Sequence, residues 1–197
     1  NVVDYHGTGS TSMTVATGPS STMTFDLEGA DGELVRASGN LNINVFNFFQ
    51  VSGSLAIESR TTRLTLADGA SVNADVLSIG GSNMRAFVGV NGGSADQIGL
   101  EARGVNFGLA LLTEQLGQGA TQAARKWTTL QATAGSVGFV GMESFVTLTA
   151  SNIAVSVNQA DGAATNVVDY AAGKTVLTVP TGSSSNITFS IKGSDGE

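Results

Sequence analysis

Nucleophilic catalysis would need a base beside a nucleophile, and this sequence offers one histidine, His6, and no cysteine. Serine and threonine are abundant, but none stands in the strand–turn–helix setting of a nucleophile elbow. The sequence contains neither a P-loop nor a dinucleotide-binding fingerprint. One histidine without thiolates also excludes the usual zinc ligand sets. We therefore expect no catalytic residue, no cofactor-binding residue and no enzymatic activity.

Calcium is the one metal that the acidic residues could bind, because it takes several carboxylate and carbonyl oxygens from a flexible loop. No D-x-D-x-D-G loop and no calcium-binding nonapeptide repeat occurs in the chain. The sequence therefore predicts no metal site, and calcium stays as the alternative. The candidate ligands are acidic residues that occur in both of two similar segments: Asp4, Asp31 and Glu33 in the first, and Asp169, Asp195 and Glu197 in the second.

Those two segments are copies of one another. NVVDY opens both residues 1–33 and residues 166–197, and about 19 of 32 aligned positions are identical. The repeat period is roughly 164 residues, far longer than the 20–50 residues of familiar solenoid repeats. The sequence thus predicts one complete repeat unit at residues 1–165 and the beginning of the next unit at residues 166–197.

Differences between the copies indicate which positions face water. Phe25 and Leu27 correspond to Phe189 and Ile191, so the apolar residues alternate in both copies. Glu28 becomes a lysine in the second copy, and such a charge reversal is tolerated only at a solvated position. The pattern predicts a half-buried strand. His6 falls beside the one alignment gap, which favours a structural residue in a loop.

Turn pairs and alternating apolar residues predict an all-β fold. Asx-Gly pairs supply the positive φ that tight hairpin turns require, and they favour an antiparallel meander. Apolar residues alternate with polar ones in most intervening runs, as in Leu41-Ile43-Val45. We expect a sandwich, a flattened barrel or a solenoid-like repeat unit with at most one short helix. The predicted turns are Asp31-Gly32, Asp68-Gly69, Asn91-Gly92, Asp161-Gly162 and Asp195-Gly196.

Three long runs change phase halfway along. The apolar set is even-numbered over residues 100–102 and odd-numbered over residues 105–111, and similar switches follow further along the chain. A one-residue slip at a glycine or an asparagine predicts a β-bulge. The switches occur at Gly104, Gly135 and Asn152.

Two segments stand out as candidate contact sites. Residues 113–126 are polar and rich in alanine and glutamine, which predicts a long loop with a helical turn at residues 121–125, and long loops are often functional. The aromatic cluster at residues 46–49, FNFF, could be a contact between units or a ligand patch. We favour the alternative that it fills the core at a strand bend. Trp127, Tyr5 and Tyr170 are expected in the core or at its rim.

Composition restricts the partners. Only 13% of residues are charged, and the net charge is −7 with a pI near 4.5. Phosphate backbones require clustered lysine and arginine, so nucleic acid is excluded as a partner. No apolar run reaches the roughly 18 residues of a membrane helix. Aromatic residues make up only 6% of the chain, which disfavours a lipid-contacting barrel.

The long repeat, with its NVVDY and ASGNLNINVFNFFQVSGSLAIE segments, resembles the repeats of very large bacterial surface or secreted proteins. That resemblance implies an extracellular or cell-surface filament, stalk or adhesin spacer in which adjacent units contact each other head to tail. The alternative function is a ligand-binding adhesion module that contacts glycan or protein through residues 113–126.

Overall fold

A computed structural model describes residues 2–6, 9 and 11–195. The chain forms two compact units, Asn1–Val35 and Arg36–Glu197. The sequence-repeat boundary after residue 165 therefore lies inside the second unit. The second repeat copy belongs to that unit because it packs on its sheet, whereas the first copy forms the smaller unit alone.

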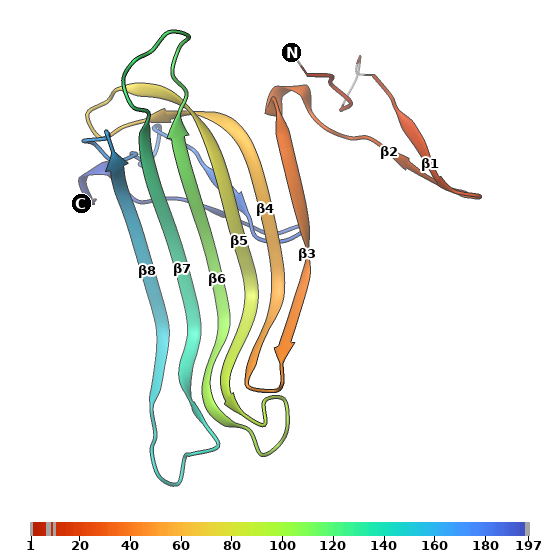
Figure 1. Cartoon of the computed structure of the whole chain (residues 1–197), viewed down its shortest axis with the longest axis vertical. Helices are drawn as coiled ribbons and strands as arrows, with labels where there is room; N and C mark the ends of the chain where they lie inside the picture. Colours follow the sequence, from red (N-terminus) through yellow and green to blue (C-terminus); the bar gives the residue numbers. More distant parts are fainter. Residues whose placement is uncertain (1, 7–8, 10, 196–197) are drawn as a thin grey trace. The chain divides into compact units, whose positions relative to one another are not determined.

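The second unit contains one six-stranded antiparallel sheet in the order β3-β4-β5-β6-β7-β8 (Figure 1). Consecutive strands are neighbours throughout, so the sheet is a meander, and β3 and β8 are its two open edges. Strands account for 59% of the described residues and helix for 3%, which confirms the all-β, antiparallel prediction. The strands are β3 (Leu34–Val45), β4 (Phe49–Thr65), β5 (Ser71–Val90), β6 (Ile98–Glu114), β7 (Arg125–Val140) and β8 (Thr149–Gly162).

The turn predictions are confirmed only in part. Asp68-Gly69 forms the tight β4–β5 turn, in which the Gly69 amide donates to the Leu66 carbonyl at 2.9 Å. Asn91-Gly92 begins a longer β5–β6 connection. Asp31-Gly32 and Asp161-Gly162 make no hairpin, which is a correction to the prediction. The first follows a 3-10 turn and leads into β3, and the second ends β8 where the chain leaves the sheet.

The predicted bulge is confirmed at Gly104, where β6 has an additional residue opposite β5, whereas the β6–β7 and β7–β8 pairings show no register shift at Gly135 or Asn152. Gly104 and Asn152 have φ of 61° and 54°, and Asn83, which the sequence pattern did not single out, has φ of 49°. The pairing register shifts between Ser52 and Ser54 of β4, opposite an additional residue in β5. Both faces of the sheet carry apolar residues, and because the strands switch their alternation at the same level, one set of apolar residues stays on the same face along the whole length of the sheet.

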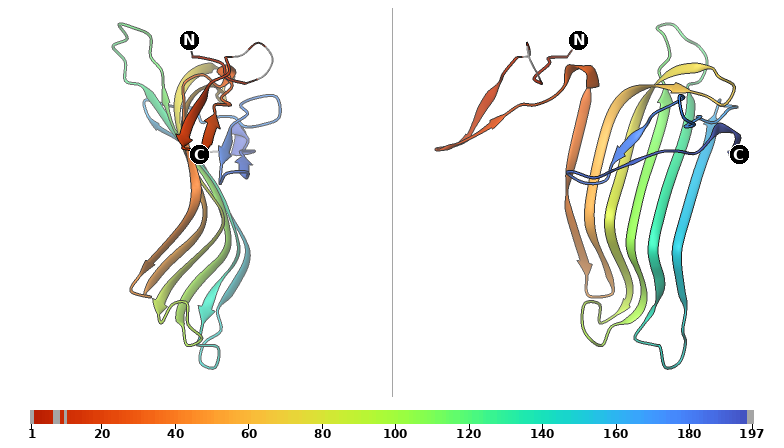
Figure 2. Two further views of the ribbon diagram at one scale, coloured as in Figure 1. Left: turned by 90° about the vertical axis from the view of Figure 1, so that its right-hand side faces the viewer. Right: turned by 180° about the vertical axis from the view of Figure 1, so that it is seen from behind.

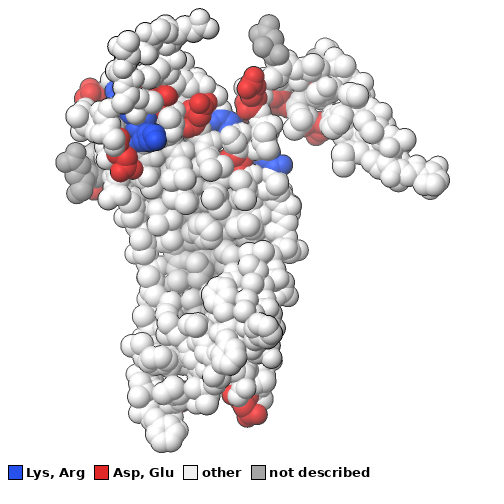
Figure 3. All heavy atoms as spheres, viewed as in Figure 1, with Lys and Arg blue, Asp and Glu red and all other residues white. Residues whose placement is uncertain are grey.

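We call the face that carries this set the open face. One cross-strand row on it runs through β4 to β8, and its end members Ile57 and Val157 are separated by Ile79, Leu109 and Leu130. A second row lies beyond the bulges and joins Phe49, Val88, Leu100 and Phe139. Figure 3 looks onto this face, where charged side chains gather towards the upper end of the sheet.

The opposite face is covered near one end by residues 166–195, which cross it as a second layer (Figure 2, right). This segment contains two short paired strands, β9 (Thr178–Pro180) and β10 (Asn186–Thr188), and a 3-10 turn, η2 (Gly193–Asp195). We call this side of the sheet the docking face. Of the predicted alternatives, the structure therefore agrees with the two-layer sandwich.

The first unit contains the same kinds of elements as residues 166–195, namely two short paired strands and a 3-10 turn. β1 (Thr14–Gly18) pairs with β2 (Ser21–Thr24), and a 3-10 turn, η1 (Gly29–Asp31), follows. Within residues 2–6, 9 and 11–195, the helical segments are the short 3-10 turns η1 and η2. Residues 121–125 form no helical turn, contrary to the prediction for that loop.

Candidate docking site for a repeat copy

The main core of the second unit lies between the docking face and residues 166–195. Trp127 and Leu112 of the sheet are each 1% exposed, and Leu177 and Val179 of the second copy are fully buried. Burial of such side chains contributes about 1.5–3 kcal/mol each. The other members of this core are Leu64, Leu66, Ala74, Val76, Ala110, Val168, Tyr170 and Phe189.

Glycines on the docking face let β9 lie directly on the sheet. A Cβ added to Gly80 would stand 2.1 Å from the Pro180 carbonyl oxygen, so only glycine fits there. A Cβ added to Gly108 would meet Val179 at 3.3 Å. Paired across β5 and β6, these two glycines form a shallow cradle for the backbone of the second copy.

Hydrogen bonds from the sheet hold the start of the second copy. The Trp127 indole Nε1 donates to the Asn166 carbonyl oxygen at 2.8 Å. Asn158 Nδ2 on β8 donates to the Val168 carbonyl oxygen at 2.8 Å. The Tyr170 hydroxyl lies 2.8 Å from the Thr129 hydroxyl, and burial raises the pKa of Tyr170. These contacts satisfy polar groups that burial would otherwise penalise.

The end of β4 also pairs with the second copy. The Ala67 amide donates to the Val167 carbonyl, and the Asp169 amide donates to the Thr65 carbonyl, both at 2.9 Å. The Thr65 amide donates to the Thr175 hydroxyl at 2.7 Å. The docking site thus recognises the second copy through its backbone as well as through its apolar side chains.

The two copies share one internal framework. The Tyr5 amide donates to the Leu27 carbonyl at 2.8 Å, and the Tyr170 amide donates to the Ile191 carbonyl at 3.0 Å. Tyr5 stacks on Phe25 with ring centroids 5.4 Å apart, and the equivalent rings of Tyr170 and Phe189 are 5.3 Å apart. This confirms that residues 1–33 and 166–197 adopt the same hairpin over their described parts.

The recurring aspartates are part of this framework. Hydrogen bonds from the amides of Gly193 and Ala171 lower the pKa of Asp169 below its ordinary value. Asp4 accepts the equivalent bonds from His6 and Gly29, and they lower its pKa likewise. These carboxylates therefore act as backbone acceptors that fix a turn. Among the described residues, no group of three or more acidic or histidine side chains could hold a metal ion.

His6 is exposed, as expected for a loop residue. Its Nδ1 lies 2.5 Å from Asp26 Oδ1, and this contact raises the pKa of His6. Asp26 is a serine in the second copy, so the pair has no counterpart there.

The predicted loop at residues 113–126 is the β6–β7 connection, and residues 115–124 lie outside both strands. Arg125 and Glu114 close its base, with Arg125 Nη2 2.6 Å from Glu114 Oε1. The guanidinium also lies 5.7 Å from the centroid of the Trp127 ring. The loop is thus an exposed hairpin loop projecting from a firmly held base, next to the docking site's tryptophan (Figure 1).

The aromatic cluster at residues 46–49 does not fill the core, which corrects the favoured interpretation. Phe46 and Asn47 form the exposed β3–β4 turn with φ of 48° and 60°, and Phe46 is 88% exposed. Asn44 fixes this turn by accepting the Asn47 amide hydrogen at 2.9 Å. The phenylalanine side chains point outward because the tight turn leaves no interior beside them.

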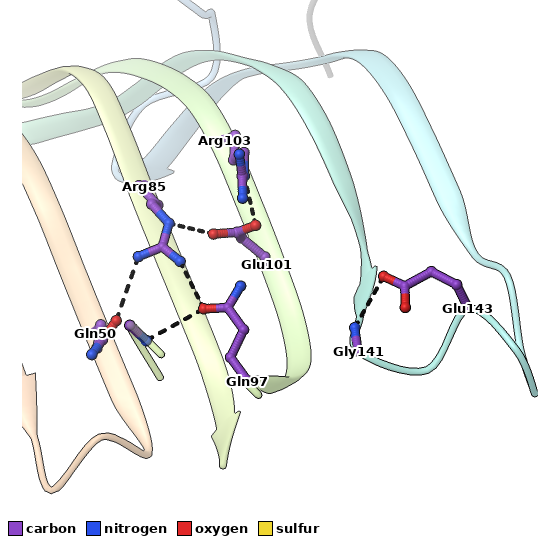
Figure 4. Close-up of polar contacts among 8 residues, drawn as sticks. Gln50, Arg85, Gln97, Glu101, Arg103, Gly141 and Glu143 are labelled. Atoms are coloured by element: carbon purple, nitrogen blue, oxygen red, sulfur yellow. Dashed lines mark hydrogen bonds and ion pairs between the residues drawn. The ribbon is translucent and has the colours of Figure 1, made fainter. Parts of the chain in front are cut away.

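Two buried glutamates, each held between two arginines, form clusters that the sequence interpretation missed. Glu58 is 1% exposed and contacts Arg36 and Arg60. The second cluster is shown in Figure 4, where Arg85 contacts Glu101, Gln50 and Gln97, and Arg103 contacts Glu101 from the same strand. The shared Glu-x-Arg pattern, at residues 58–60 and 101–103, was the available sequence signal.

A polar pocket of about 370 Å³ adjoins the first cluster. Arg36 and Arg60 line one side, and the serine-rich β9–β10 turn at residues 182–185 lines the other. A buried charge must be paired to be tolerated, and Glu58 neutralises one of the arginines here. The arrangement therefore ties β3 and β4 together beside the second copy.

No family model, curated protein or solved structure matches the chain. Within the described part of the chain, no helix is both long and apolar enough to span a membrane.

Proposed function

We propose that this chain is a non-catalytic structural module of a tandem-repeat protein that forms an extended bacterial cell-surface or extracellular filament or stalk. One observation carries the proposal: the beginning of the second repeat copy supplies five of the twelve residues of the main core, and the six-stranded sheet with its β4–β5 turn supplies the other seven. A repeat whose core is completed by its successor depends on a neighbour, and arrays of such units gain stability from each added interface.

Head-to-tail contacts of this kind support extension rather than closure. The surface that receives the second copy, around Trp127 and Leu112, differs from the surface that the second copy presents, so the contact is heterologous. Such contacts propagate into open arrays when the rotation between units does not close a ring. The low proportion of charged residues, 13%, and the absence of cysteine agree with an exported β-rich repeat.

The test is to express arrays of one, two and four repeat copies and to measure their maximum dimension by small-angle X-ray scattering. An extended stalk should lengthen by a constant increment per copy. An array that stays compact as copies are added would overturn the proposal.

A second candidate function is glycan or protein binding through the β6–β7 loop. The observation that favours it is the projection of residues 115–124 from a base fixed by Glu114 and Arg125. Replacing these ten residues with a glycine-serine linker should leave folding intact, and loss of cell adhesion in the replaced array would support this candidate.

A further inference from the structure

The first repeat copy carries the same apolar side chains as the second, but they lie exposed. Val168 and Val179 of the second copy are fully buried, whereas the equivalent Val3 and Val15 are 52% and 39% exposed. Leu177 is fully buried and its equivalent, Met13, is 44% exposed. Since the two hairpins have the same internal hydrogen bonds, the hairpin does not bury these side chains by itself, and the sheet that the second copy packs on accounts for their burial there.

The polar contacts of the docking site can also be reproduced by the first copy. Val3, Tyr5 and Thr11 are identical to the three second-copy residues that bond to Asn158, Thr129 and Thr65. The contact that changes involves Gln131, which bonds to the Ser190 amide at 2.9 Å and to its hydroxyl at 3.4 Å. Asp26 replaces that serine, and although its Oδ1 contacts His6, its backbone amide can donate to a glutamine as the Ser190 amide does.

The cradle also suits the first copy. Pro180, whose carbonyl lies against Gly80, corresponds to Ala16, a smaller residue with the same backbone groups. Thr17 and Ser21 share a hydroxyl contact of 3.0 Å, and Thr181 and Ser185 share one of 2.9 Å at the equivalent place. No replacement introduces a larger side chain at a position where β9 approaches the sheet backbone.

We propose that residues 2–35 of one unit dock on the docking face of the preceding repeat copy, in the place that residues 166–195 occupy on this sheet. The inference rests on the tandem arrangement proposed above and names its interface. The partner is a second copy of this sheet, recognised by Trp127, Leu112 and the Gly80–Gly108 cradle. Each hairpin then completes the core of the preceding unit. The chain continues from the hairpin into β3, the first strand of the following sheet.

The test is a chimera in which the sequence of residues 1–33 replaces residues 166–197. The chain has no cysteine, so one thiol can be introduced at each position of interest. Val15→Cys is made either in the N-terminal copy or in the transplanted copy. Val179→Cys in the natural chain is the buried reference, because valine and cysteine have similar volumes.

We expect the transplanted thiol to react with a maleimide on the order of 100-fold more slowly than the N-terminal thiol, as is typical of groups that react only after local opening. Met13→Asp in the transplanted copy should restore fast labelling. The same substitution in the N-terminal copy should leave the labelling of the transplanted copy unchanged.

Equal labelling rates for the two positions would overturn the inference. A chimera that loses the cooperative unfolding of the natural chain would overturn it too, because the first copy would then not fit the site. Neither result depends on whether repeat arrays lengthen with each added copy, so the proposed function is tested separately by the scattering measurement.

Discussion

The Trp127 indole nitrogen and the Asn166 carbonyl oxygen lie 2.8 Å apart, and this bond joins the sheet of one repeat to the first residue of the next copy. Trp127 is the chain's one tryptophan and is 1% exposed. The second copy is therefore attached to a core residue of the sheet directly after the repeat boundary, although Thr165 at the boundary is itself exposed.

Trp127→Phe should lower the free energy of unfolding by about 2 kcal/mol. The substitution removes the indole donor and leaves the Asn166 carbonyl without this partner, and it also reduces the volume of the core. Urea unfolding followed by circular dichroism measures the change. An unchanged midpoint would show that the bond does not anchor the second copy.

Leu112→Ala and Leu111→Ala form a matched pair on β6. Leu112 faces the docked copy and is 1% exposed, whereas Leu111 faces the open side of the sheet and is 41% exposed. We expect losses of about 3 kcal/mol for Leu112→Ala and less than about 1 kcal/mol for Leu111→Ala. Equal losses in chemical denaturation would mean that both faces are covered in solution.

Gly80→Ala should displace β9 and destabilise the second unit by more than about 2 kcal/mol, because the added methyl group overlaps the Pro180 carbonyl. Gly39→Ala is the control, since its methyl group would have nothing within 4 Å. The fluorescence of Trp127 should shift to longer wavelength only in the Gly80 variant. Identical spectra for the two variants would contradict the close packing of β9.

Asp169→Asn should reduce the loss of stability in acid. The pKa of Asp169 lies below its unfolded value of 3.8 in the folded protein, because the amides of Gly193 and Ala171 donate to it. Its contribution is therefore fully present above pH 3.8 and is lost as the pH falls through the folded pKa. The check is the free energy of unfolding measured across this range. If the free energy of unfolding fell with pH equally in the variant and in the natural chain, the Asp169 carboxylate would not contribute to the loss of stability in acid.

Chelation should leave the melting temperature unchanged, because the carboxylates of Asp4 and Asp169 already accept hydrogen bonds from backbone amides. Differential scanning calorimetry with EDTA and with millimolar calcium provides the measurement. A rise of many degrees in calcium would show a bound ion through binding linkage.

Local chemistry in the sequence was enough to predict the strands, the bulge at Gly104 and the equivalence of the two copies. Positive φ is accessible to glycine and asparagine at low cost, so the phase switches at Gly104 and Asn152 identified two residues with positive φ, and the switch at Gly104 also identified a bulge. Alternation likewise predicted that Phe189 is buried while its neighbour Ser190 is exposed. These features depend on residues near each other in the chain.

The tertiary structure alone decided which face of the sheet is covered and what covers it. Both faces carry apolar residues, and the sequence does not say that Leu112 meets the second copy while Leu111 does not. The Asp31-Gly32 and Asp161-Gly162 pairs resemble the Asp68-Gly69 hairpin in sequence, yet only the latter has a partner strand on both sides. The aromatic cluster at residues 46–49 was wrongly predicted to lie in the core, because its burial also depends on contacts with distant residues. Burial is set by contacts between residues such as Trp127 and Asn166, which are 39 positions apart, and those contacts exist only once the chain has folded.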